Sequence, residues 1–236
     1  KIPIVVSEVA NPMYLKRKSS ILIRNLIFKM SSGIIFQTQR AQDYYKDIIN
    51  NARIVIPNAL GNEYIFKVPE INNRANKICA MGRITPEKDY PTLIRAFSIV
   101  AKKHPEYILE IFGRGSPEDL LALAEELGIR DKVFFMGAHP DAILKIADSK
   151  CYVLSSISEG MPNALMEAMA IGLPCVSTDC PNGPAELIEN EVNGLLVPMQ
   201  DEKALAEAIL RMIEDEEFAN KCGENAKKIK ETNSVE

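Results

Sequence analysis

"KICAMGRITPEKDYPTLIRAFSIVAKKHPEYILEIF", residues 77–112, is the stretch that decides the fold. Two short apolar runs, KICAM and YILEIF, flank a helical pattern over residues 91–103, and Asp89 stands where a capping residue is expected. One face of this helix collects the apolar side chains of Leu93, Ala96, Phe97 and Val100. A strand, a helix and a second strand in this order are typical of a βαβ unit, so the stretch predicts a parallel sheet.

The same alternation continues toward the end of the chain. Further strands are predicted at KVFFM (132–136), CYVLS (151–155), PCVST (174–178) and GLLV (194–197). Further helices are predicted over residues 118–127, 141–147, 162–171, 184–189 and 202–213. Together these elements predict a doubly wound, Rossmann-like α/β domain of about six strands over residues 77–236.

The first part of the chain, residues 1–58, also follows an α/β pattern. Its predicted strands cover residues 2–7, 33–38 and 53–57, and its predicted helices cover residues 21–30 and 39–49. Three strands do not complete a sheet of this type, so we expect the C-terminal part of an incomplete N-terminal domain. Residues 59–76, rich in Asn and turn-forming residues, are the expected linker. Because the sequence begins with Lys1 rather than Met, we expect a piece of a longer protein.

Composition narrows the class of protein. With 47% hydrophobic and 25% charged residues over 236 positions, the chain has the composition of a soluble globular protein. A net charge of -4 argues against nucleic-acid binding, and neither a membrane-spanning run nor a signal peptide is visible. Five cysteines without C-x-x-C spacing indicate reduced, buried thiols in a cytoplasmic protein. Two histidines are too few for a His-based metal site.

The loops after the predicted strands carry the polar chemistry, and ligands of open α/β sheets bind at these strand ends. Five such loops are rich in glycine and polar residues: GRITPEKD, GRGSPE, GAHPD, ISEGMPN and DCPNGPAE. Arg83 and Lys88 share the first loop, and two other loops lead into helices opened by Pro162 and Pro184. A guanidinium, an ammonium and free helix N–H groups would together neutralise a diphosphate. The alternative is that these residues are solvated charges and plain turns.

Three glutamates stand out in these loops and in the helices that follow them. Glu167 falls in the middle of an apolar helix in SEGMPNALMEAMA (158–170), where a carboxylate must neutralise or find a partner. A ribose diol would supply that partner, and backbone N–H groups or an arginine are the structural alternative. Glu159, at the loop tip, would meet a sugar. Glu186 is either a further contact or an acid that stabilises the first turn of its own helix.

Three other kinds of site find little support. A dinucleotide fingerprint needs G-x-G-x-x-G at the first βα turn, but GRGSPE has two of the glycines and follows the second strand of its domain. No Asp-x-Asp occurs, so a metal carrying a diphosphate is not indicated. Cys180 precedes a proline in a loop and could be exposed, but no histidine is patterned to activate it as a nucleophile.

The motifs GRITPEKD, FGRG, SEGMPNALMEAMA, GLPCVSTD and GPAELIENEVNGLLVP together resemble the retaining GT-B glycosyltransferases of the large family four. The resemblance extends from about Gly33 to Glu216. It implies two Rossmann-like domains facing a cleft, with a nucleotide-sugar donor bound mainly by the C-terminal domain. TDCPNGPAE is similar to a subset that transfers hexose or N-acetylhexosamine from UDP donors during assembly of bacterial surface polysaccharides, such as lipopolysaccharide or capsule, on glycan or lipid-linked acceptors.

The resemblance also implies roles for single residues. Arg83 and Lys88 would bind the donor diphosphate and stabilise its departure, and Glu167 would bind the ribose. Glu159 would contact the donor sugar. The backbone of Gly160, Met161, Pro162 and Asn163 would contact the donor sugar and phosphate together with Glu159. The loop of residues 137–139, with Ala138 and His139, would lie beside the base. Gly82, Gly113 and Gly115 are further implied donor contacts. No separate cofactor is expected, because the nucleotide sugar is the substrate.

The implied chemistry is front-face attack, in which the leaving diphosphate oxygen takes the acceptor proton. SEVANPMY (7–14) resembles the family's segment at the cleft but has no histidine, so no contact from the N-terminal domain to the sugar is assigned. A chain that lacks most of its acceptor domain should bind donor weakly and transfer little. Two rivals remain: a non-catalytic nucleotide-sugar-binding protein on the same fold and a GT-B nucleotide-sugar epimerase.

One basic stretch stands out in this acidic chain. Between Val9 and Gln42 there is no Asp or Glu, and there are six basic residues: Lys16, Arg17, Lys18, Arg24, Lys29 and Arg40. Ile21, Leu22, Leu26 and Ile27 lie among them. Such a helix can settle on an anionic membrane, so we expect peripheral, salt-sensitive association with the inner face of the plasma membrane. The alternative is a solvated basic face.

Overall fold

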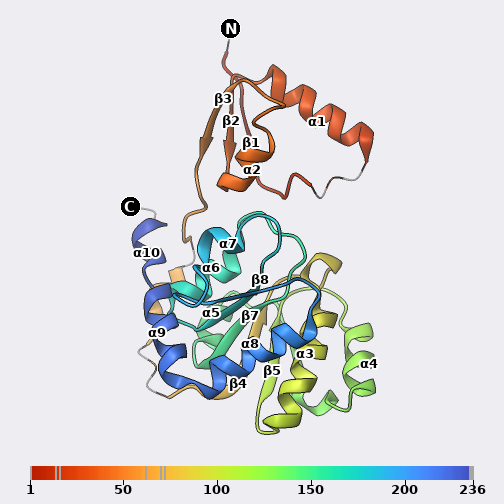
Figure 1. Ribbon diagram of the computed structural model, residues 1–236, viewed down its shortest axis with the longest axis vertical. Coiled ribbons are helices and arrows are strands. Elements are labelled where there is room, and N and C mark those ends of the chain that lie inside the picture. The colour runs from red at the N-terminus through yellow and green to blue at the C-terminus, as the bar shows by residue number, and fades with distance from the viewer. Residues whose placement is uncertain are drawn as a thin grey trace.

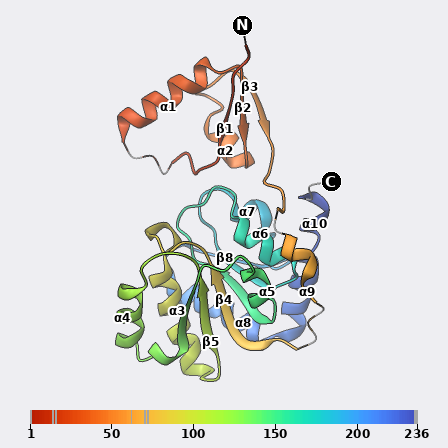
Figure 2. The same ribbon diagram turned by 180° about the vertical axis from the view of Figure 1, so that it is seen from behind.

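The computed structural model describes residues 2–13, 15, 17–61, 63–69, 71 and 73–233. The chain forms two α/β units, with the N-terminal unit drawn above the larger C-terminal unit (Figure 1). A single segment after β3 joins the two units, and the C-terminal helix α10 ends beside it in both views (Figure 2).

The C-terminal unit contains the predicted six-stranded parallel sheet, in the order β6-β5-β4-β7-β8-β9. Its strands are β4 (Ala75–Met81), β5 (Ile108–Phe112), β6 (Val133–Gly137), β7 (Ser149–Leu154), β8 (Cys175–Thr178) and β9 (Leu195–Val197). The chain leaves β4 in one direction along the sheet and returns to its other side at β7. This reversal between β4 and β7 is where doubly wound sheets bind ligands.

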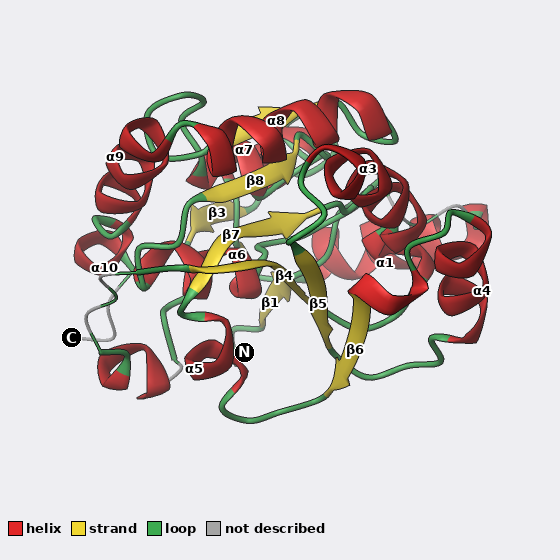
Figure 3. Cartoon of the chain, turned by 90° about the horizontal axis from the view of Figure 1, so that it is seen from below, coloured by secondary structure: helices red, strands yellow, loops and turns green. Residues whose placement is uncertain are grey.

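Helices cover both faces of this sheet, as Figure 3 shows. On one face pack α3 (Tyr90–Lys103), α4 (Glu118–Glu126) and α8 (Glu202–Glu214). On the other pack α5 (Ala142–Ile146), α6 (Asn163–Ala170) and the 3-10 helix η1 (Glu63–Lys67), and α7 (Pro184–Leu187) is a single turn. The predicted apolar face of α3 is buried in the core.

Asp89 lies at the predicted position before α3 but does not act as a side-chain cap. Asp89 does precede α3, but its backbone is left-handed, with φ 47°, and its side chain makes no capping hydrogen bond to the helix. A capping side chain normally extends from a β-region backbone over the first free N–H groups. The turn out of the 3-10 helix η2 (Pro86–Lys88) gives Asp89 a different backbone conformation.

Two helices beyond residue 214 were not anticipated, α9 (Glu216–Ala226) and α10 (Ile229–Thr232). After α10 the chain is tied to the segment between the units: Asn233 Nδ2 donates to Asn58 O at 2.9 Å, and Leu60 N donates to Asn233 O at 2.8 Å. Leu60 and Ile65 are buried in the core of the C-terminal unit. Much of the segment predicted as a linker therefore packs on that unit.

The N-terminal unit contains the three predicted strands, which form a parallel sheet in the order β1-β2-β3. It contains β1 (Val5–Glu8), α1 (Lys18–Met30), β2 (Gly33–Phe36), α2 (Gln39–Tyr44) and β3 (Ala52–Val55). α2 is shorter than the predicted residues 39–49. The core of this unit is small: Phe28, Ile34, Phe36, Ala41, Tyr45 and Ile49.

Candidate functional site

The loops after β4 and β5 lie against each other at the carboxyl edge of the large sheet. A Cβ added at Gly113 would lie 1.8 Å from Gly82 O, and one added at Gly115 would lie 2.6 Å from Ile84 Cβ. Gly113 N also donates to Gly137 O at 2.8 Å. Contact between protein loops is therefore enough to require Gly113 and Gly115, whereas the sequence suggested approach to a ligand.

Lys88 and Glu159, predicted to act separately, form one ion pair. Lys88 Nζ lies 2.6 Å from Glu159 Oε1, and the two side chains are 16% and 11% exposed. The hydroxyl of Ser156 donates to the same carboxylate oxygen at 2.6 Å. A largely buried pair is held well only when hydrogen bonds complete it, so Glu159 and Lys88 are oriented together.

Arg83 differs from Lys88 in its surroundings. Its side chain is 77% exposed, and its guanidinium lies 3.9 Å from the carboxylate of Glu87 in the same loop. A weak, solvated pair of this kind costs little to break. Arg83 can therefore turn toward an anion at the sheet edge, and its assignment to a diphosphate stays a prediction.

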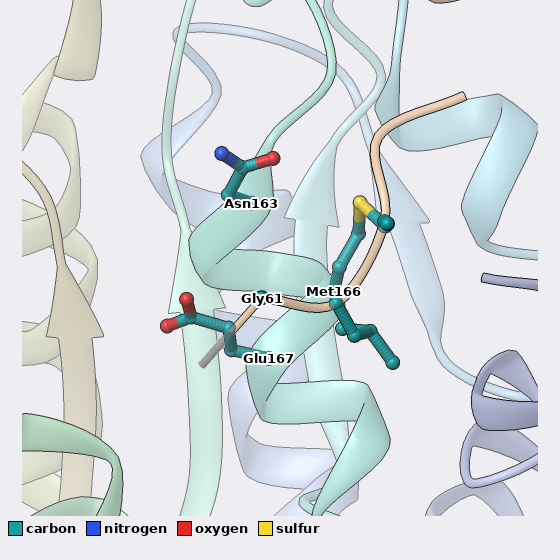
Figure 4. Close-up of a pocket in the computed structure, with 6 residues that line it drawn as sticks. Gly61, Asn163, Met166 and Glu167 are labelled. Atoms are coloured by element: carbon teal, nitrogen blue, oxygen red, sulfur yellow. The ribbon is translucent and has the colours of Figure 1, made fainter. Parts of the chain in front are cut away.

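Glu167 lies on the open side of α6. The helix is apolar and largely buried, as predicted, with Glu167 in its middle. The Glu167 side chain itself is only half-buried, because it borders two cavities. One cavity, of about 250 Å³, is lined by Ala59, Leu60, Gly61, Asn163, Met166 and Glu167. Figure 4 shows Asn163, Met166 and Glu167 projecting from α6 beside the chain at Gly61.

The second cavity, of about 220 Å³, joins Glu167 to the loop after β6. Its lining is Met81, Phe112, Gly113, Ala138, His139, Pro140, Ala142, Ile143, Ala164 and Glu167. The rings of Phe112 and His139 meet edge to face, 6.2 Å apart, and His139 Nε2 lies 2.9 Å from Met136 O. A largely apolar wall with a carboxylate at its border has the chemistry needed for a planar base joined to a ribose.

Two predicted residues, Gly160 and Asn163, contact the N-terminal unit. A Cβ at Gly160 would lie 2.3 Å from Val9 O, so the two backbones touch. Asn58 Nδ2 donates to Asn163 Oδ1 at 2.7 Å. Met161 and Pro162, between them in sequence, are buried.

Glu186 makes a contact that neither alternative anticipated. Its carboxylate accepts from the backbone N–H groups of Gln39 at 2.7 Å and Arg40 at 3.0 Å, at the start of α2 in the other unit. The acid lies in the first turn of α7 but caps a helix 146 and 147 residues away in sequence. Sequence reasoning also missed Asn11 and Asn182, whose side chains meet between the units at 2.9 Å.

The expectation that Cys180 could be exposed was wrong. The residue is fully buried, and burial, helped by the nearby Glu159 carboxylate, raises the pKa of its thiol to about 12. Such a thiol stays protonated at neutral pH and is no nucleophile. All five cysteines lie in the described part of the chain, where they are buried and free. Among the described residues no cluster of three or more His, Cys, Asp or Glu side chains could hold a metal ion.

Residues 62–229 match the family described as glycosyl transferases group 1. The chain belongs to this family. Its similarity to an uncharacterised glycosyltransferase of Methanocaldococcus jannaschii is 29% identity, covering 91% of this chain and 63% of that protein. It is 27% identical to an N-acetylgalactosamine-N,N'-diacetylbacillosaminyl-diphospho-undecaprenol 4-alpha-N-acetylgalactosaminyltransferase of Campylobacter jejuni, covering 96% of this chain and 66% of the relative. This chain thus spans about two thirds of the length of both relatives.

Solved structures confirm the GT-B fold. A TarM mutant from S. aureus, in complex with fondaparinux, alpha-GlcNAc-glycerol and UDP, superposes with a TM-score of 0.87 at 23% identity. The match covers 98% of this chain and 48% of that one. The two-unit arrangement, a doubly wound domain below part of a second α/β domain, is therefore that of GT-B glycosyltransferases.

Proposed function

We propose that the full-length protein is a retaining glycosyltransferase that moves a hexose or N-acetylhexosamine from a UDP-sugar to a glycan or lipid-linked acceptor. The observation that carries the proposal is the grouping of polar side chains and a cavity at the carboxyl edge of the large sheet, around β4 and β7. There a cavity suited to a base and a ribose, bordered by Glu167, lies in the same loop cluster as Arg83 and the Lys88–Glu159 pair. The family match and a relative named for an undecaprenol-linked substrate support surface polysaccharide synthesis.

In this proposal each group has a task that its chemistry allows. The cavity between Phe112, His139 and α6 takes the base, and Glu167 accepts two hydrogen bonds from the ribose diol. Arg83, Lys88 and the start of α6 face the diphosphate, where positive charge favours departure of the leaving group. Glu159, next to Lys88, lies at the end occupied by the sugar.

The test is UDP binding by calorimetry, followed by a screen of UDP, GDP and ADP sugars with the full-length protein. UDP binding and transfer to a glycan or lipid-linked acceptor are expected. A new sugar isomer formed from donor alone would identify an epimerase. Binding without turnover on any acceptor would indicate a nucleotide-sugar-binding protein.

Glu167→Gln is expected to weaken donor binding about tenfold, because an amide keeps the shape but loses charge-assisted hydrogen bonds to the ribose. The measurement is the UDP dissociation constant together with the donor KM. Glu126→Gln on α4, exposed and outside both cavities, is the matched control and should change neither. A collapsed melting temperature with unchanged UDP affinity would make Glu167 a structural acid.

We further propose that the protein associates with an anionic membrane on the cytoplasmic side, through an α1 surface made of Arg17, Lys18, Leu22, Ile23, Leu26, Ile27, Lys29 and Met30. The side chains of this surface are exposed. The basic stretch is weaker than the sequence suggested, because Arg24 turns inward and Arg40 lies 3.4 Å from Asp179. Lys16 lies outside the described residues. In the described part of the chain no helix has the length and apolar character to span a membrane.

Sedimentation with liposomes tests this surface. Each exposed basic residue contributes roughly 1 kcal/mol near an anionic leaflet, so binding should need anionic lipid and fall with salt. Lys18→Glu with Lys29→Glu should abolish sedimentation, whereas Lys102→Glu with Lys103→Glu on α3 should not. Equal binding to neutral and anionic vesicles, or none at low salt, would defeat the proposal.

A further inference from the structure

The loop after β1, residues 9–13, is the part of the N-terminal unit that contacts the loop holding Glu159. Val9 O occupies the space that a Cβ at Gly160 would need, at 2.3 Å. Two residues further on, Asn11 is 7% exposed. A buried amide side chain between two units must have its hydrogen-bonding groups satisfied, and those partners show what it holds.

Asn11 joins three segments. Its Nδ2 donates to Ser158 Oγ at 3.0 Å. Its Oδ1 accepts from Asn182 Nδ2 at 2.9 Å and from Met13 N at 3.0 Å. Asn182 is itself 4% exposed, in the loop after β8. One side chain therefore connects the N-terminal unit to two loops at the carboxyl edge of the large sheet.

The loop that carries Asn11 is fixed from within its own unit. Arg24 donates to Pro12 O at 2.9 Å, and its guanidinium lies 3.9 Å from the carboxylate of Glu8. Tyr45 donates its hydroxyl to the same carboxylate at 2.9 Å. Burial and the Glu8 charge raise the pKa of Tyr45, so the hydroxyl remains a donor at neutral pH. Asn11 thus follows the position of β1 and α1.

On the other side, Ser158 directly precedes Glu159. The Glu159 carboxylate is held by Lys88 and Ser156, both at 2.6 Å. A shift of Ser158 is transmitted through one peptide bond to the backbone of Glu159. Further contacts also join the units: Glu186 holds the start of α2, Asn58 donates to Asn163 at 2.7 Å, and Arg40 lies 3.4 Å from Asp179. None of these three involves Ser158.

We propose that Asn11 is a positioning residue for transfer: its hydrogen bond to Ser158 places the Glu159–Lys88 pair against the donor when the N-terminal unit is seated. The inference rests on the proposed function. It assigns Asn11 no contact with substrate. Removing the bond leaves the cavity beside Phe112 and His139 intact, so the base is still bound. The loop that holds Ser158 and Glu159 is then no longer fixed in position against the sugar.

The test is a double-mutant cycle in the full-length protein with Asn11→Ala, Ser158→Ala and the double variant. Each single variant is expected to lower kcat about fivefold with little change in donor KM or UDP affinity, in keeping with the loss of one hydrogen bond. The double variant should be little worse than either single, because both remove the same bond. Hydrogen exchange of residues 156–161 should accelerate in all three.

Asn51→Ala is the matched control. Asn51 lies in the same unit, where its Nδ2 donates to Phe28 O at 2.8 Å without contacting the other unit. Asn51→Ala should lower the melting temperature, as we also expect of Asn11→Ala, but it should leave kcat unchanged. Two outcomes would overturn the role of Asn11. One is additive effects of Asn11→Ala and Ser158→Ala on kcat, and the other is an unchanged kcat in Asn11→Ala with a lower melting temperature. A wild-type protein that binds no UDP would instead overturn the proposed function, and the exchange data would still report the Asn11–Ser158 contact.

Discussion

Lys88→Ala in the full-length protein is expected to lower kcat/KM for sugar transfer. The expected loss of transition-state stabilisation is on the order of 2–4 kcal/mol. The ammonium would no longer face the departing diphosphate. The same change removes the cation that lies 2.6 Å from Glu159, whose side chain is 11% exposed. An uncompensated, largely buried carboxylate destabilises the fold, so the melting temperature should fall as well.

Two companion variants separate these effects. Arg83→Ala should lose transfer to a similar degree but keep the melting temperature, because the Arg83 side chain is 77% exposed. Lys88→Ala combined with Glu159→Gln removes the unpaired charge, so stability should recover while transfer stays low. If kcat/KM is unchanged in both Arg83→Ala and Lys88→Ala, neither residue acts on the diphosphate.

The positions of most strands and helices could be predicted, because the pattern of apolar residues that marks each one is local in the sequence. The inner strands of the large sheet are mostly buried and read as short apolar runs, whereas the edge strand β6 exposes Phe134 and Met136. The buried face of α3 shows as a helical period in the sequence. The strand order could not be read in this way, since it depends on crossovers. The helices after residue 214 were missed because α9, with EEFANKCGEN, is mostly polar.

The partners of the site residues could not be predicted, because they are distant in sequence. Lys88 and Glu159 are 71 residues apart, and Glu186 caps a helix 146 and 147 residues away. The sequence marked these charges as unusual in their loops but contains no information on which opposite group folds beside them. Asn11 was missed for the same reason: an Asn before Pro is an ordinary turn signal until its three partners are known.

Gly113→Ala tests how closely the loops at the sheet edge are packed. The new Cβ would lie 1.8 Å from Gly82 O and 2.6 Å from Gly82 C, which are backbone atoms that no side-chain rotation can move away. The loop after β4 must therefore shift, and overpacking of this kind costs about 3 kcal/mol. Thermal unfolding measures it, with a melting temperature lower by roughly 6–12 °C for a chain of this size.

The same shift should reach the donor site, because Gly113 lines the cavity that includes Phe112 and His139. UDP affinity in Gly113→Ala is thus expected to fall along with stability. Gly61→Ala is the matched control, since a Cβ there would meet no described atom within 4 Å, and its melting temperature should equal that of the wild type. A Gly113→Ala protein as stable as the wild type would show that the two loops do not pack as closely as 1.8 Å implies, and the shape of the cavity would then need another explanation.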